Sequence, residues 1–189
     1  MKNLIQQIVE ESISTKKDFF SQNIEAIEAC ASMMAGTLKH GRKILLFGNG
    51  GSAADCQHIA AEFINRFQTE RKPLAAIALT TDTSVITSIG NDYSYGDVFL
   101  KQIQAFGRQG DIALGISTSG NSPNIIKAAQ EAKNLGLCVI GFSGSEGKLK
   151  DLSDFPFCVS SGTTARIQEV HIMLGHILCD LTERMIFSE

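Results

Sequence analysis

From Lys43 onwards, short apolar runs alternate with helical patterns, and this alternation restricts the fold more than any other feature of the chain. The runs cover residues 43–47, 74–79, 111–116, 137–142 and 155–159. Each run is continuously apolar, as is typical of strands that are buried on both faces. Helices are expected over residues 53–65, 83–90, 95–107, 123–135 and about 164–187. The pattern predicts a single domain over residues 1–189, whose α/β core covers residues 41–189 and contains a parallel sheet with right-handed crossovers.

The first 40 residues contain helical patterns and no strand pattern. Apolar residues follow helical spacing twice, first at Leu4, Ile5, Ile8, Val9 and Ile13, and again at Ile24, Ile27, Ala31 and Met34. The spacing predicts a pair of N-terminal helices over residues 1–40, the first of which stands off the domain. Because an exposed apolar stripe is normally buried by a partner, we expect a second copy of the chain to cover it.

Composition excludes several classes of protein. A chain of 189 residues with a net charge of -3 and no lysine- or arginine-rich run lacks the basic face that nucleic-acid binding requires. The apolar runs are too short to span a bilayer, so we expect no membrane association. Five cysteines without a C-x-x-C pair do not form a disulfide framework. Together these features predict a reduced, cytoplasmic protein.

The first polar loop, Gly48-Asn49-Gly50-Gly51-Ser52, follows the 43–47 strand and precedes a helix. Glycines permit a tight turn and a close approach of a ligand to backbone N–H groups, and Ser52 can cap the helix. A helix N-terminus attracts anions. On the same helix His58 and Glu62 share a face. An ordinary strand–turn–helix with a solvated polar face explains this segment equally well.

Two further polar loops follow predicted strands. One contains Thr80, Thr81 and Asp82, with Asn91-Asp92 close behind, and the other runs from Ser117 to Pro123. In the second, Ser122 suits the cap and Pro123 the first helical position. Its hydroxyls and N–H groups predict a phosphate cradle without a lysine, although a serine-rich capping turn is the alternative. Neither the Walker A nor the dinucleotide pattern is present.

The last predicted helix carries polar residues on an otherwise apolar pattern. Gln168, Glu169, His171 and His176 interrupt a face formed by Ile167, Val170, Leu174, Ile177, Leu178 and Leu181. A histidine in an apolar helix is more often a core or interface residue than a ligand. Taken alone, these residues do not indicate a site.

Taken together, however, these segments resemble the sedoheptulose 7-phosphate isomerases, also called phosphoheptose isomerases, within the sugar isomerase (SIS) domain family. The resemblance covers nearly the whole chain. Its motifs are Gly48–Ser52, His58-x-x-x-Glu62, Asn91-Asp92, Gly115–Ser122, and Arg166-Ile167-Gln168-Glu169-x-His171 with His176. The serine-rich loop alone identifies only a phosphosugar site of the SIS type.

The resemblance implies a three-layer α/β fold with a five-stranded parallel sheet of flavodoxin-like winding, and a homotetramer with sites at subunit interfaces. It also implies one zinc ion per subunit, whose ligands correspond to His58, Glu62, Gln168 and His176. The implied substrate-binding residues are Asn49, Gly50, Gly51, Glu62, Asn91, Asp92, Ser117, Thr118, Ser119, Ser122 and Gln168, and we add Ser52 from the first loop. Ala165 departs from the Asp that some members carry at that position.

The implied reaction converts sedoheptulose 7-phosphate to D-glycero-D-manno-heptose 7-phosphate through an enediol(ate), for heptose in surface polysaccharide such as lipopolysaccharide. Such a reaction needs a base, for which we expect Glu62, and an acid for the sugar oxygens, for which we expect His176. A metal would polarise the carbonyl. Gln168 and His176 are about 12 Å apart along a helix, so they reach one ion only by leaning together or from different subunits.

Two other functions compete with this one. An SIS relative that binds the bacterial replication initiator is also similar in Phe63–Phe67, Thr69–Arg71 and Cys179–Leu181. In that relative the positions of Glu62 and His176 are not a carboxylate and an imidazole, which favours an enzyme here. SIS isomerases of arabinose 5-phosphate usually carry additional domains, for which this chain has no room.

Overall fold

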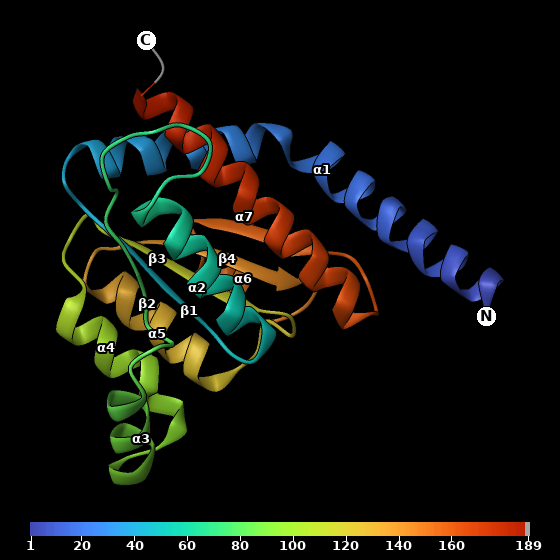
Figure 1. Ribbon diagram of the computed structural model, residues 1–189. Coiled ribbons are helices and arrows are strands. Elements are labelled where there is room, and N and C mark those ends of the chain that lie inside the picture. The colour runs from blue at the N-terminus through green and yellow to red at the C-terminus, as the bar shows by residue number, and fades with distance from the viewer. Residues whose placement is uncertain (188–189) are drawn as a thin grey trace.

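The computed structural model describes residues 1–187 and contains a single five-stranded sheet with helices on both faces (Figure 1). In chain order the elements are α1 (Lys2–Lys39), β1 (Ile44–Gly48), α2 (Gly51–Ile64), β2 (Ala76–Ala78), α3 (Thr83–Asp92), the 3-10 turn η1 (Tyr95–Asp97), α4 (Val98–Phe106), β3 (Ile112–Ser117), α5 (Pro123–Asn134), β4 (Cys138–Gly144), α6 (Leu149–Leu152), β5 (Phe155–Val159) and α7 (Thr164–Phe187). Within these residues no helix is long and apolar enough to cross a membrane.

All neighbouring strands are parallel, in the order β2-β1-β3-β4-β5. This order confirms the predicted parallel sheet and its flavodoxin-like winding. The winding reverses between β1 and β3, which pair directly from Ile44 with Ile112 to Gly48 with Ile116. Loops that follow these two strands leave the sheet side by side, at the position where open α/β sheets bind ligands.

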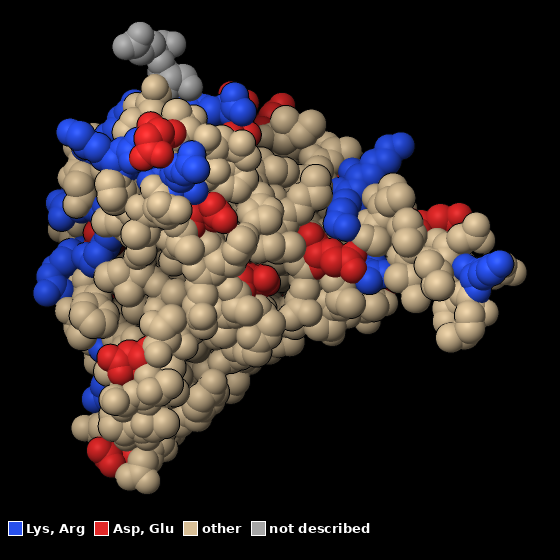
Figure 2. Space-filling model, in the orientation of Figure 1, with Lys and Arg blue, Asp and Glu red and all other residues tan. Residues whose placement is uncertain are grey.

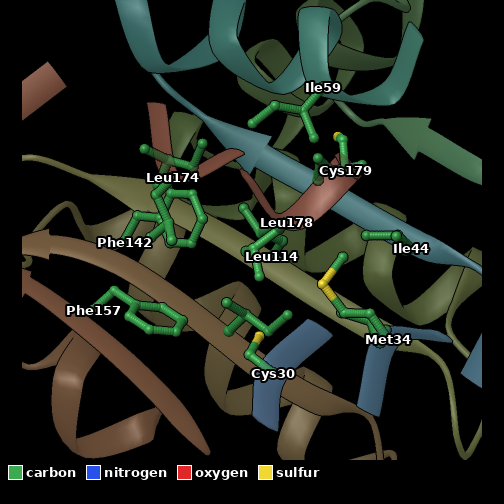
Figure 3. Close-up of a cluster of buried hydrophobic side chains, with 14 of the residues drawn as sticks. Cys30, Met34, Ile44, Ile59, Leu114, Phe142, Phe157, Leu174, Leu178 and Cys179 are labelled. Atoms are coloured by element: carbon green, nitrogen blue, oxygen red, sulfur yellow. The ribbon is translucent and has the colours of Figure 1, made fainter. Parts of the chain in front are cut away.

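Two hydrophobic cores, one on each face of the sheet, give the three predicted layers. Ile44 and Leu46 of β1 face a core formed with α1, α2 and α7, whereas Leu45 and Phe47 face a core formed with α4 and α5. Figure 3 shows the first core, in which Met34 of α1, Ile59 of α2 and Leu174 of α7 gather over the sheet. Burial of both faces explains why the strands are continuously apolar.

The prediction of two N-terminal helices is wrong, because α1 is one continuous helix of 38 residues. The segment between the two apolar patterns, residues 14–23, contains neither glycine nor proline, so no residue interrupts the backbone hydrogen bonds. The second half of α1 buries Ile27, Cys30 and Met34 against the domain. The first half extends away from it (Figure 1), and its apolar stripe is exposed as predicted.

Several element boundaries also differ from the prediction. Strand β2 has only three residues in place of 74–79, partly because the N–H of Leu74 turns back to the carbonyl of Phe63. The helix expected over 95–107 divides into η1 and α4, and the short α6 has no counterpart in the prediction. Helix α2 starts before Ser52, so Gly50 occupies the N-cap position that was predicted for Ser52.

A buried carboxylate joins the starts of two central strands. Asp111 is almost completely buried and accepts hydrogen bonds from the backbone N–H groups of Lys43 (3.1 Å) and Arg108 (2.9 Å). It also pairs with the ammonium group of Lys43 at 2.5 Å. Removal of this side chain would leave an ammonium group and two N–H groups without their acceptor.

We therefore expect Asp111→Ala to lower the free energy of unfolding by about 2–4 kcal/mol, in the range measured for broken buried pairs. Denaturant titration measures the change. Asp151→Asn, at an exposed position on α6, serves as the control and should leave the midpoint unchanged. Equal midpoints for both variants would show that Asp111 does not stabilise the fold.

Candidate active site

The loop between β1 and α2 places backbone N–H groups at the carboxyl edge of the sheet. Gly50 has a positive φ of 55°, a conformation that other residues rarely adopt. Its carbonyl accepts the N–H groups of Ala53 and Ala54, which starts α2 without a side-chain cap. Ser52 is buried inside the first turn. The first N–H groups of α2 therefore point towards any ligand that lies at this edge.

The loop between β3 and α5 gathers hydroxyl groups at a second helix N-terminus. The hydroxyl oxygen of the buried Ser117 lies 3.0 Å from that of Ser122 and 3.4 Å from that of Ser119. Ser122 is the N-cap residue and Pro123 the first helical residue, as predicted, but the Ser122 hydroxyl makes no capping hydrogen bond. Hydroxyl donors and the N-terminal end of α5 thus face the same point, an arrangement that suits phosphate.

An amide pair that the sequence analysis missed connects the two loops. Asn49 and the buried Asn124 exchange reciprocal hydrogen bonds of 2.9 Å, and the hydroxyl of Tyr95 donates to the same Asn49 oxygen at 3.2 Å. Because its oxygen already accepts two hydrogen bonds, Asn49 has one free N–H to offer a ligand. Asn124 follows Pro123 in a helix-start pattern, and the sequence carries no signal for this contact.

A second polar cluster lies between α2 and α7. The Nε2 atoms of His58 and His176 are 2.8 Å apart, and Nε2 of His58 is 3.5 Å from a carboxylate oxygen of Glu62. The Glu62 side chain is 23% exposed and that of His58 is 48% exposed, so solvent and small molecules reach both. The structure therefore brings together three of the four residues that the resemblance assigns to a metal, and both of the residues that it assigns to catalysis.

Burial favours a neutral His176. Burial away from water has the largest effect and lowers the pKa of the His176 imidazole. The neighbouring His58 lowers this pKa further, whereas the Glu62 carboxylate raises it. At 2.8 Å the two Nε2 atoms share one hydrogen bond, so one ring donates a proton and the other accepts it. The pair can hold a proton at a defined position next to a carboxylate.

Gln168 lies at the other end of the α2–α7 contact. A Cβ atom added to Gly51 would stand 2.6 Å from the amide nitrogen of Gln168, so this side chain packs against the first loop. At the level of His58, a Cβ added to Gly175 would stand 2.5 Å from Ile59. The two helices therefore run parallel in close contact, which separates Gln168 from the His58–His176 pair by about 12 Å of helix rise.

Three other residues lie outside these clusters. Asn91 and Asp92 end the exposed helix α3, and within residues 1–187 their side chains hydrogen-bond only to each other. The hydrogen bonds thus do not join them to either loop. His171 is fully buried, contacts the carbonyl of Ser143 at 3.1 Å, and has its pKa lowered to about 4 by burial. It is a neutral core residue.

The donor set between α2 and α7 fits a zinc ion in chemical type. Imidazole nitrogen and carboxylate oxygen are common zinc ligands, and two nitrogens on one tetrahedral ion would lie about 3.3 Å apart. The observed 2.8 Å is a hydrogen-bond distance, so the rings would separate by about 0.5 Å to admit an ion. Among residues 1–187 no three His, Cys, Asp or Glu side chains already form a metal-binding geometry.

Comparison with known proteins identifies relatives along the whole chain. The model of the SIS domain family matches residues 7–144. A phosphoheptose isomerase from Clostridium acetobutylicum is 52% identical over 192 residues, an alignment that covers 100% of this chain and 98% of the relative. A phosphoheptose isomerase from Aquifex aeolicus is 49% identical, with 98% of each chain covered.

Solved structures give the same result. A phosphoheptose isomerase from Neisseria gonorrhoeae superimposes with a TM-score of 0.88 at 43% identity, covering 96% of this chain and 98% of that one. A phosphoheptose isomerase from Francisella tularensis superimposes with a TM-score of 0.92 at 39% identity, covering 96% and 97%.

The hydroxyl-rich loop between β3 and α5, which contains Ser117, Ser119 and Ser122, should bind inorganic phosphate. A ligand that binds only the folded protein raises the melting temperature, so phosphate at millimolar concentration should stabilise the chain. Ser119→Ala removes a hydroxyl from the loop and should raise the dissociation constant for phosphate about 2- to 10-fold, as expected for one hydrogen bond. Ser88→Ala, in the exposed helix α3, is the control. A melting temperature that does not respond to phosphate would exclude the cradle.

Proposed function

The chain belongs to the SIS domain family and, within it, to the phosphoheptose isomerases, and we propose that it interconverts sedoheptulose 7-phosphate and D-glycero-D-manno-heptose 7-phosphate. The full-length identity of about one half to several phosphoheptose isomerases carries this proposal. The Glu62 carboxylate of α2, which is joined to the His176 imidazole of α7 through His58, supplies with that imidazole the groups that the reaction needs. The protein is therefore an enzyme of the aldose–ketose isomerase class.

The substrate phosphate is proposed to bind where the loops after β1 and β3 meet. Ser117, Ser119 and Ser122 offer hydroxyl donors, and the helix α5 directs its N-terminus to the same point. Thr118 and the N–H groups of Gly50 and Gly51 complete the cradle. Hydroxyl and N–H donors without a lysine bind the phosphate by directed hydrogen bonds.

Isomerisation moves one proton between neighbouring carbons and one between neighbouring oxygens. In the proposed sequence, Glu62 removes a proton from C1 of the ketose, and the electron pair forms the C1–C2 double bond of an enediol. His176 gives a proton to O2 and accepts one from O1. Glu62 then returns its proton to C2, which leaves the aldehyde at C1 and a hydroxyl at C2.

The state of His176 suits this role. Because burial lowers its pKa, the imidazole is neutral near pH 7 and carries one donor and one acceptor nitrogen. A neutral ring can give a proton to one oxygen and take one from the other.

The distance between the two clusters supports a site that is shared between subunits. Glu62 lies eleven residues beyond Gly51, or about 16 Å along α2. From C1 to the phosphorus, a heptose 7-phosphate has eight bonds of about 1.5 Å and spans less than about 12 Å. We therefore propose that the phosphate cradle of one subunit faces the Glu62–His176 pair of another.

We also propose a zinc ion as cofactor, one per subunit. His58, Glu62 and His176 would hold it. Because Gln168 lies about 12 Å along α7 from this cluster in the same chain, the fourth ligand that the family leads us to expect would be Gln168 of a second subunit. When bound, the ion would polarise the substrate carbonyl. Its presence would also require the Glu62 carboxylate to shift between its roles as ligand and as base.

A homotetramer is proposed from the apolar surface that a single chain leaves uncovered. A groove of about 540 Å³ opens between α1 and α7. Its apolar lining consists of Phe20, Ile24, Ile27, Met173, Ile177, Leu181 and Met185. The apolar residues in the first half of α1 are exposed as well, and Figure 2 shows few charged residues on the face formed by α2 and α7. A second copy that inserts its own α1 would cover both surfaces.

The product is proposed to supply heptose for surface polysaccharide such as lipopolysaccharide, with the enzyme acting in the cytoplasm, where sugar phosphates are made. The alternative function, binding of the replication initiator, is not favoured. The carboxylate and imidazole that distinguish an enzyme are both present and in contact through His58. Three relatives that are each 52% identical to this chain are phosphoheptose isomerases.

Substitution of the proposed base and acid should abolish most activity while preserving the fold. Glu62→Gln keeps the shape but loses the base, and His176→Asn loses the proton carrier, so each should lower kcat by at least about 100-fold. NMR of the sugar products and a coupled assay measure the change. Bound zinc, followed by elemental analysis, should fall in both variants.

Gln57→Ala, on the exposed face of α2 next to His58, is the matched control and should keep wild-type kcat. If the wild type and both variants are equally inactive on sedoheptulose 7-phosphate while initiator protein binds to all three, the isomerase assignment is wrong.

The apolar stripe of α1 should control assembly. Deletion of residues 1–20, or Ile13→Glu within the stripe, should lower the mass measured by light scattering, because a buried charge opposes association. Glu10→Gln, exposed on the same helix, should leave the mass unchanged. A wild-type monomer at micromolar concentration would contradict the proposed tetramer.

A further inference from the structure

A buried carboxylate on α7 holds the loop that follows α2. Glu183 lies seven residues after His176, and its side chain is only 3% exposed. Its oxygens accept the backbone N–H groups of Phe67 (3.1 Å), Gln68 (2.9 Å) and Thr69 (2.7 Å). The guanidinium of Arg71 donates a fourth hydrogen bond at 2.9 Å. The loop is thereby fixed to α7 at four points.

The same arginine binds the end of α2. Its side chain is 2% exposed, and its remaining nitrogens donate to the carbonyls of Phe63 (2.6 Å) and Glu62 (2.8 Å). These carbonyls lie in the last turn of α2, where no later residue of the helix offers them an N–H group. The planar guanidinium therefore connects the backbone of Glu62 directly to the carboxylate on α7.

The loop that follows α2 also contacts His176, the proposed catalytic acid. The ring of Phe67 packs against the imidazole of His176 with centroids 5.7 Å apart and planes tilted by 33°. Phe67 is also the first residue whose N–H is bound by Glu183. One buried ion pair thus fixes the turn that carries Glu62, the ring that covers His176, and the helix that carries His176.

We propose that Arg71 and Glu183 are positioning residues for the isomerisation, which hold Glu62 and His176 in the relative orientation that proton transfer requires. The inference rests on the proposed function of those two side chains. It assigns a role to a buried ion pair whose hydrogen bonds do not involve the phosphate cradle. A geometric error of about 1 Å between reacting groups costs about 100-fold in rate, so rigid support has a measurable effect.

The electrostatics of the pair agree with a permanent structural role. Burial by itself raises the pKa of Glu183, but three N–H groups and Arg71 lower it to about 2. Because this value lies below the ordinary value of 4.5, the stabilisation is complete above about pH 4.5 and is lost as the pH falls towards 2. Glu183 therefore stays ionised throughout the pH range of an isomerase assay.

A merely structural role for this pair predicts different kinetics. If the pair only stabilises the fold, its disruption would lower the melting temperature without changing kcat at temperatures where the protein is folded. If the pair positions the catalytic residues, its disruption would lower kcat while KM stays constant, because the phosphate cradle is built from other loops. The two effects can be separated by measurement well below the melting temperature.

The test compares Glu183→Gln with Asp180→Asn in the full-length protein. Glu183→Gln keeps the shape but weakens the bonds to the loop and to Arg71, and should lower kcat at least 10-fold with KM within 2-fold. Asp180→Asn breaks the exposed pair with Arg184 on the same helix and should leave both constants unchanged. An unchanged kcat in folded Glu183→Gln would overturn the proposal.

A second variant covers the case in which Glu183→Gln does not fold. Phe67→Leu leaves the ion pair intact and removes only the aromatic contact with His176, so it should lower kcat about 3- to 10-fold at constant KM. If Phe67→Leu keeps wild-type kcat, the loop does not position the histidine and the proposal fails.

A spectroscopic measurement separates this inference from the proposed function. With ¹⁵N-labelled histidine, NMR reports the ring nitrogens of His58 and His176, whose shared proton gives them distinct shifts. These shifts should move in Glu183→Gln and Phe67→Leu but not in Asp180→Asn. If the wild type lacks isomerase activity and the shifts still move, the proposed function fails, whereas the inference that the ion pair fixes the orientation of His176 stands. If the shifts do not move in either variant, the positioning role fails whatever the activity.

Discussion

The parallel contact between α2 and α7 is the interaction on which the site depends. The helices touch at Gly51 with Gln168, at Ile59 with Gly175, and through Arg71 with Glu183. Because both helices rise by 1.5 Å per residue, contact at both ends fixes the register in between. That register brings His58 against His176 and leaves Gln168 at the first loop. A shift of α2 by one turn along α7 would separate His58 from His176 by about 5 Å, and the two side chains would no longer be in contact.

The fold places the residues proposed to bind the phosphate and the residues proposed to catalyse the reaction on different elements. The cradle after β3 is built on a strand that is buried on both faces, so its hydroxyls are held by the rigid centre of the sheet. The residues proposed to transfer protons lie on two helices that pack on one face of that sheet. A change in the helix pair would therefore alter the proposed reaction without altering the proposed phosphate cradle, in keeping with the rule that one fold can host different functions.

Sequence patterns predicted those features that depend on local spacing. Apolar runs predicted all five strands, and the i, i+4 spacing of His58 and Glu62 predicted their shared face. The contact of His58 with His176, 118 residues apart, depends on tertiary packing and carries no local signal. The same holds for Arg71 and Glu183, 112 residues apart. The break predicted in α1 failed because a change in apolar pattern does not by itself end a helix without glycine or proline.

The environment of His176 shows why burial is needed as well as proximity. In water, an imidazole 2.8 Å from another and near a carboxylate would gain a proton readily and pair with that carboxylate. An imidazolium has two donors and no acceptor, and a paired Glu62 would be a weaker base. Burial lowers the pKa of His176 against the opposing effect of Glu62. Phe67 packs against the ring of His176, so the loop that Glu183 holds lies directly against this imidazole.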